Sequence, residues 1–172
     1  MAKLRTDDTA LDFTLPATDG KTYNLHDAFK NARAVAVVFT CNHCPYAIAW
    51  EDRINSIARD YATQGVRLFA INANNASTHP ADSFENMAKR ASQKHFVFPY
   101  LHDESQSVAR SYGPERTPEF FIFDAAQKKL LGLHIKGTLT GDEDQIVDDK
   151  ARAVGGDCGI HAGNNFVFTS CV

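Results

Sequence analysis

The sequence contains no run of apolar residues long enough to span a bilayer, which takes about 18 to 20 residues. Its first residues, MAKLRTDDTALDF, lack the apolar segment that a secretory signal requires. We therefore expect no transmembrane segment, no membrane partner and a cytoplasmic location.

An excess of charge of one sign is also missing. The 172 residues carry 18 Lys and Arg against 21 Asp and Glu, which gives a net charge of −3. No run of basic residues exceeds two, as at Lys128-Lys129, and there is no glycine-rich phosphate loop. These absences argue against nucleic acid as a partner and against a nucleotide cofactor, and we expect no cofactor and no bound metal.

Cysteine is scarce, with four residues in the chain. This number argues against a small scaffold held together by disulfides, because cytosolic thiols are kept reduced. A chain of this length with 44% hydrophobic residues builds its own core. We expect a single domain over residues 1–172, in which a close cysteine pair serves catalysis or metal binding.

The hydrophobic pattern predicts an α/β fold with a mixed central sheet flanked by helices. The segment DFTLPATDGKTYNL predicts an N-terminal hairpin that turns at Asp19-Gly20. Apolar, β-branched segments predict buried strands at 32–39 and 66–72, and a helix over 45–64 joins them as a parallel βαβ unit.

The second half of the chain continues the pattern. We predict two further helices, followed by two antiparallel strands, over residues 84–91, 103–112, 119–124 and 129–135. The core of the domain is expected to span about residues 10–136. Residues 137–155 have the acidic start and spaced apolar residues of a terminal helix, and 156–172 form a tail without usable periodicity.

Cys41 and Cys44 form a close pair in VVFTCNHCPY, where a buried strand ends and a helix begins. Helix N-termini favour thiolate over thiol, and cysteines at such Cys-x-x-Cys sites have pKa values of about 3.5 to 7.5 instead of about 8.5. A protonated His43 would favour the thiolate too. Two intervening residues let the sulfurs reach disulfide distance. The pattern predicts a redox-active dithiol, with Cys41 facing solvent as nucleophile and Cys44 as resolving thiol.

A metal site is the alternative for this pair. Cys158 and His161, in CGIH, could complete a Cys3His zinc site, and the protein would then be a non-catalytic zinc-binding or redox-sensing module. Zinc pairs normally lie on loops or knuckles, whereas this pair lies between a buried strand and a long helix, which favours redox chemistry. Glu51 is interpreted as a surface charge, and His79 and the remaining histidines as surface or loop residues.

The stretch GPERTPEFFIF contains the second functional candidate. Thr117-Pro118 directly precedes a strand, and X–Pro is the one bond at which a cis peptide costs little. A trans proline that merely begins the strand is the alternative. The functional interpretation is a cis-proline loop that faces the dithiol and docks an extended substrate through its backbone.

These segments resemble the thioredoxin-like superfamily, and within it the peroxiredoxin-like branch of alkyl hydroperoxide reductase/thiol-specific antioxidant or redoxin domains. The resemblance rests on four segments in the expected order, namely DFTLPATDGKTYNL, VVFTCNHCPYAIAWEDR, FPYLHDESQSVARSYG and TPEFFIFD. It implies a thioredoxin-like fold, Cys41 and Cys44 as the active dithiol, and Pro118 as the cis-proline beside it.

The chain departs from the peroxiredoxin pattern, Pro-x3-Thr-x2-Cys with a distant Arg. Aligned on Cys44, the chain has Val37 in place of the proline and Cys41 in place of the threonine. The position expected for the arginine falls on Pro118, and Arg116 lies two residues away. These departures from the peroxiredoxin pattern favour disulfide exchange, and thiol peroxidase activity is the alternative. His43 and Arg116 are the candidates for tuning the thiols.

The sequence thus predicts a thiol-disulfide oxidoreductase. Its partners would be protein or small-molecule disulfides and an external thiol reductant, and hydroperoxides would be the substrates under the peroxidase alternative.

Overall fold

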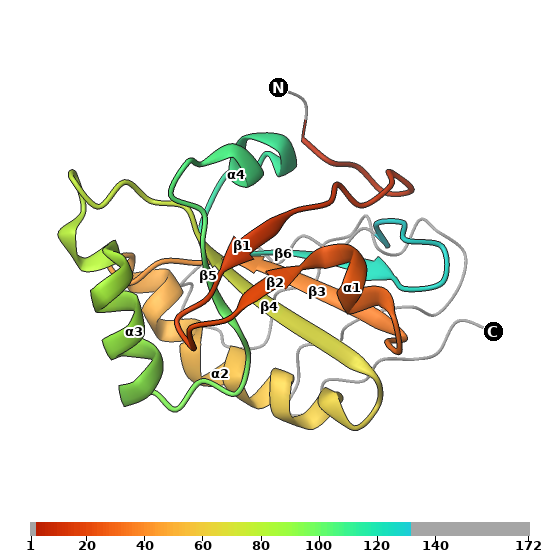
Figure 1. Ribbon diagram of the computed structural model, residues 1–172, viewed down its shortest axis with the longest axis horizontal. Helices are drawn as coiled ribbons and strands as arrows, with labels where there is room; N and C mark the ends of the chain where they lie inside the picture. Colours follow the sequence, from red (N-terminus) through yellow and green to blue (C-terminus); the bar gives the residue numbers. More distant parts are fainter. Residues whose placement is uncertain (1–2, 132–172) are drawn as a thin grey trace, which may run out of the picture.

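The computed structural model describes residues 3–131, and its central feature is a four-stranded mixed sheet (Figure 1). The strand order is β5-β4-β3-β6. β3 pairs in parallel with β4, β4 pairs in parallel with β5, and β6 runs antiparallel to β3. The strands are β3 (Ala34–Phe39), β4 (Val66–Asn72), β5 (Tyr100–His102) and β6 (Glu119–Asp124).

The remaining elements surround this sheet. A hairpin of β1 (Thr14–Pro16) and β2 (Thr22–Asn24) forms a separate two-stranded sheet. The helices are α1 (Leu25–Phe29), α2 (Pro45–Ala62), the 3-10 turn η1 (Pro80–Asp82), α3 (Phe84–Gln93) and α4 (Ser107–Tyr112). No helix within residues 3–131 is long and apolar enough to cross a membrane.

Both faces of the central sheet are buried, each under different elements. Along β3, Val35, Val37 and Phe39 point into one core, while Ala36 and Val38 point into the other. The first core is closed by the hairpin, α1 and α4, and the second by α2 and α3 (Figure 1). A strand buried on both faces needs apolar residues at consecutive positions. This is why the uninterrupted run AVAVVF marks β3 in the sequence.

The main predicted elements are confirmed. The hairpin, the parallel βαβ unit of β3, α2 and β4, the helix that begins at Phe84 and the antiparallel β6 are all present. The α/β class and the mixed sheet follow from them. The sequence interpretation missed α1 and β5, because segments of five and three residues are too short to show a period.

Two predicted boundaries are wrong. The helix expected from Asp103 begins at Ser107, since the buried Asp103 carboxylate accepts the Ala109 N–H at 2.9 Å and Gln106 adopts a left-handed φ of 59°. In the strand expected over 129–135, Lys129 and Leu130 form isolated bridges only. Its remainder from residue 132, the terminal helix over 137–155 and the tail over 156–172 lie outside the described residues.

Candidate active site

The predicted dithiol lies at the carboxyl end of β3, where the chain turns into α2. Pro45 occupies the first turn of α2, and Cys44 is the N-cap residue. Proline suits this position because its missing N–H would have no partner inside the helix. Cys44, rather than Cys41, is therefore the cysteine that meets the free N–H groups and the positive end of the helix dipole.

Cys44 is half-buried, and its environment favours the thiolate. Partial burial acts against ionisation, but hydrogen bonds from the Ala47 backbone N–H, from Thr117 and from the Tyr46 backbone N–H outweigh it. Together they lower the pKa of the Cys44 thiol. Such a thiol is the more reactive member of a pair, because the thiolate is the nucleophile.

Cys41 has the opposite environment, and the prediction that it faces solvent is wrong. Its side chain is 2% exposed. Burial raises the pKa of the Cys41 thiol and the nearby Asp82 carboxylate adds to this, against the opposing hydrogen bonds from Thr117 and the backbone. The cause is the helix start: because α2 begins after Cys44, the preceding loop leaves Cys41 at the buried end of β3.

The predicted proline loop meets the dithiol. The Thr117-Pro118 peptide is cis, and the Thr117 hydroxyl lies 3.2 Å from the Cys41 Sγ. The Cys44 thiol donates to the Thr117 carbonyl oxygen at 3.6 Å. Thr117 therefore contacts both thiols, while its part with Pro118 in substrate docking stays a prediction.

A buried carboxylate at this site was missed by the sequence interpretation. Asp82 is 0% exposed. One of its oxygens accepts from the Asn42 backbone N–H at 2.6 Å and from Asn72 Nδ2 at 2.8 Å, and the other accepts from His43 Nδ1 and from Asn74 Nδ2 at 3.3 Å. The available signal was topological, because loops that follow adjacent parallel strands meet at one edge of the sheet.

The two predicted tuning residues lie in different places. His43 bonds to Asp82 rather than to a thiol, and its ring stacks on His79 with centroids 4.1 Å apart. Arg116 is exposed, and its backbone N–H donates to Glu119. Within residues 3–131 the Arg116 guanidinium makes no hydrogen bond or ion pair. Glu51 is another correction, since it is buried and forms a bidentate ion pair with Arg90.

The same cluster has the spacing of a metal site. Ligand atoms of Cys41, His43 and Asp82 all lie within 4.8 Å of one another. Each Asp82 oxygen already accepts two hydrogen bonds, however, so in this arrangement the carboxylate is bonded to His43 rather than open to an ion. The other proposed zinc ligands, Cys158 and His161, lie outside the described residues.

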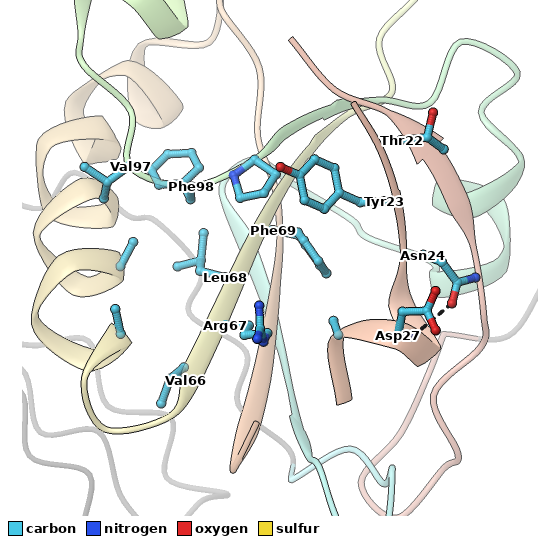
Figure 2. Close-up of a pocket in the computed structure, with 14 residues that line it drawn as sticks. Thr22, Tyr23, Asn24, Asp27, Val66, Arg67, Leu68, Phe69, Val97 and Phe98 are labelled. Carbon is cyan, nitrogen blue, oxygen red and sulfur yellow. Dashed lines mark hydrogen bonds between the residues drawn. The ribbon is translucent and has the colours of Figure 1, made fainter. Parts of the chain in front are cut away.

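A pocket of about 380 Å³ opens elsewhere on the molecule, between β2, α2 and β4 (Figure 2). Tyr23, Phe69, Val97 and Phe98 contribute much of its lining. None of the residues that contact the two thiols lines it. The loop cluster that holds the two thiols is therefore separate from this pocket.

The comparisons with known proteins bear on the family and the fold of this chain. The redoxin family model matches residues 5–149. An uncharacterized conserved protein from Geobacillus kaustophilus is 34% identical, with a TM-score of 0.75 over 87% of this chain and 79% of that chain. A protein described as a thiol:disulfide interchange protein from Chlorobium tepidum is 25% identical, with a TM-score of 0.62 over 78% of this chain and 89% of that chain.

A peroxidoxin from Mycobacterium tuberculosis shares the fold at 23% identity, with a TM-score of 0.65 over 89% of this chain and 99% of that chain. No protein with a curated description matches the chain. The family match covers most of the sequence, and the neighbours share the mixed sheet and its flanking helices. This chain therefore belongs to the redoxin family, with a thioredoxin-like fold and an oxidoreductase function.

Proposed function

We propose that the protein is a thiol-disulfide oxidoreductase in which Cys44 attacks the substrate and Cys41 resolves the intermediate. The observation that carries this proposal is the opposite ionisation of two thiols that share Thr117, with the pKa lowered at Cys44 and raised at Cys41. A partly accessible thiolate such as that of the half-buried Cys44 is suited to attack, whereas a buried neutral thiol avoids side reactions until it is needed.

The reaction balances in two exchange steps. The Cys44 thiolate attacks a substrate disulfide R–S–S–R′, so that a Cys44–S–S–R mixed disulfide forms and R′S⁻ leaves. Cys41 loses its proton and attacks the Cys44 sulfur, which releases RS⁻ and leaves a Cys41–Cys44 disulfide. The substrate gains two electrons and becomes two thiols, and an external thiol reductant restores the dithiol.

The surroundings of Cys44 fit a disulfide carried by a protein or a small molecule. Tyr46 follows Pro45 in the first turn of α2 and is 41% exposed, so its aromatic ring is accessible to a bound substrate. The backbone of Thr117 lies within reach of the Cys44 sulfur. We infer that an extended substrate segment pairs with this backbone and packs on Tyr46. Neither contact requires a specific side chain on the substrate.

Peroxide reduction is the second candidate, because the same Cys44 environment suits it. The Cys44 thiolate would attack a hydroperoxide ROOH to give a sulfenic acid and ROH, and Cys41 would condense with the sulfenic acid to a disulfide and water. Against this route, within residues 3–131, an arginine that would help to polarise an O–O bond is not among the main groups that shift the pKa of either thiol.

The test compares Cys44→Ser and Cys41→Ser with the parent protein, using an aromatic disulfide reagent and hydrogen peroxide as substrates. We expect Cys41→Ser to retain fast attack and to accumulate a mixed disulfide at Cys44, detected by mass, while Cys44→Ser loses fast attack. Peroxide consumption faster than disulfide attack would replace the proposal with the peroxidase. Zinc at one equivalent in the purified protein, with loss of fold on chelation, would replace it with the binding module.

A further inference from the structure

The resolving step leaves one requirement that Cys41 does not meet by itself. If Cys41 resolves the mixed disulfide, as the proposed function holds, this 2% exposed thiol has to lose a proton while it is shielded from bulk solvent. A buried thiol ionises readily only when a base lies close to it. The question is which group of this chain takes the proton, and where the proton goes next.

Asp82 is the base that the geometry offers. An Asp82 carboxylate oxygen lies within 4.8 Å of the Cys41 sulfur, a distance that one water molecule or a small side-chain rotation bridges. Asn42, Asn72 and Asn74 hold this carboxylate from three sides. Amide donors stabilise a carboxylate without supplying a titratable proton, so they keep Asp82 in place as an acceptor.

His43 connects this buried site with solvent and so allows a proton to leave it. It is the one titratable side chain among the four hydrogen-bond partners of Asp82, and its side chain is 35% exposed. An imidazole bonded to a carboxylate through Nδ1 can give up or take a proton at Nε2. The His79 ring stacks on one face of His43.

The other groups that face Asp82 do not compete for this role. From β5, the Tyr100 hydroxyl donates to the Asn42 side-chain oxygen and accepts from Asn72. Burial raises the pKa of Tyr100, so its phenol stays protonated. Cys41 itself contributes the proton to be moved. Within the described residues, His43 is thus the titratable group that connects Asp82 with solvent.

We propose that Asp82 and His43 form a proton relay for Cys41. As the mixed disulfide forms on Cys44, the Cys41 S–H proton passes to the Asp82 carboxylate, and the Cys41 thiolate attacks the Cys44 sulfur. His43 keeps its Nδ1 proton in the hydrogen bond to Asp82 and releases the proton of its other ring nitrogen, Nε2, to solvent or to the departing thiolate RS⁻, so the pair takes up one proton and gives up one. Electrons are exchanged only between sulfur atoms, so no further oxidant or reductant is required.

The direction in which Asp82→Asn changes the rate of resolution separates a proton-accepting role of Asp82 from a purely electrostatic one. Burial is the largest cause of the raised pKa of Cys41, and the negative charge of Asp82 adds to it. If Asp82 acted only as a charge, Asp82→Asn would therefore favour the Cys41 thiolate and speed resolution. If Asp82 accepts the proton, the same change removes the acceptor and slows resolution.

The experiment follows single turnover of the full chain with one equivalent of 5,5′-dithiobis(2-nitrobenzoate), with Cys158 and Cys171 replaced by Ser in every sample. Attack by Cys44 releases the first thionitrobenzoate in a bimolecular phase. Resolution by Cys41 releases the second in a unimolecular phase, whose rate does not depend on reagent concentration. We expect Asp82→Asn to slow the second phase at least about tenfold relative to the first phase at pH 7.

His43→Ala is the second variant, and it keeps the test decisive if Asp82→Asn does not fold. We expect it to slow the second phase several-fold, whereas the matched control His79→Ala, which removes a stacked imidazole that has no bond to Asp82, has little effect. At high pH, hydroxide ionises Cys41 directly, so the variant and parent rates should converge.

Three outcomes would overturn the relay. These are a second phase in Asp82→Asn as fast as or faster than in the parent, a slowing that persists unchanged at high pH, or an equal loss in His79→Ala and His43→Ala. Failure of the proposed function looks different, because the parent protein itself would then lack the fast first phase or the unimolecular second phase.

Discussion

Cys41 and Cys44 are of one residue type and stand three positions apart, yet their ionisation differs because of where α2 begins. Pro45 in the first turn makes Cys44 the N-cap and leaves Cys41 behind at the buried strand end. The sequence carried this signal, since proline favours the first helical position. The expectation of an exposed Cys41 rested on the Cys-x-x-Cys spacing, which does not fix the helix start.

At the same scale, a side-chain hydrogen bond from Thr117 is one of several interactions that favour the Cys44 thiolate and lower the pKa of Cys44. Thr117→Val keeps the shape of the side chain and removes the hydroxyl, so we expect the pKa of Cys44 to rise. Below that pKa the thiolate fraction falls, and alkylation by iodoacetamide at pH 7 slows several-fold. Well above it the two proteins react alike.

The pH dependence of the alkylation rate, measured from pH 5 to 10, provides the check. Thr117→Ser is the matched control, because it retains the hydroxyl and should keep the parent profile. A Thr117→Val profile with its midpoint unchanged, or displaced to lower pH, would show that the hydroxyl does not stabilise the Cys44 thiolate.

At the scale of the elements, α2 positions the dithiol and is itself held by a buried charge. Glu51 on α2 is 4% exposed and accepts two hydrogen bonds from Arg90 on α3, at 2.7 and 2.8 Å. The sequence interpretation took Glu51 for a surface charge, and its burial shows only in the contact between α2 and α3. The two hydrogen bonds from the Arg90 guanidinium offset the free-energy cost of burying the Glu51 carboxylate.

Breaking the buried Glu51–Arg90 pair should destabilise the protein more than breaking an exposed ion pair within α3. Arg90→Gln leaves the Glu51 carboxylate with Lys94 at 3.8 Å as its remaining cation, and we expect the free energy of unfolding to fall by about 2–4 kcal/mol. Lys89→Gln, which breaks the exposed pair with Glu85, should change the free energy of unfolding far less, because solvent screens that pair. Urea unfolding of the reduced proteins measures both, and equal costs would contradict a buried, charged Glu51.

At the scale of the whole molecule, the site is assembled from three loops that are distant in the sequence. Two of them could be predicted, because the Cys41–Cys44 motif and Thr117-Pro118 each carry a local signal. Asp82 carries none. It lies in a polar segment after β4, and its place beside Cys41 follows from the parallel pairing of β3 with β4, which brings the carboxyl ends of both strands to one edge. Periodicity predicts elements, whereas burial and contacts between loops depend on how the elements pack.

The N-terminal segment joins parts of the molecule that lie far apart in the chain. The Leu4 N–H donates to the Tyr112 carbonyl at the end of α4, and the Lys3 Nζ lies 2.5 Å from the buried Glu119 at the start of β6. This close approach depends on Gly113, whose φ is +69° and where a Cβ would lie 2.9 Å from the Lys3 Cα. Glycine meets both requirements there, since it adopts positive φ without strain and adds no side chain.

Gly113→Ala should therefore lower the free energy of unfolding by more than the strain of an alanine at positive φ. Gly20 is the matched control, because its φ is +80° and a Cβ there would meet nothing within 4 Å. We expect Gly20→Ala to lower the free energy of unfolding by about 1 kcal/mol, the cost of an alanine in the left-handed region. Gly113→Ala should lower it by about 1–3 kcal/mol more, because backbone of the N-terminal segment has to move. Urea unfolding gives both values, and equal losses would mean that the N-terminal segment does not pack against the end of α4.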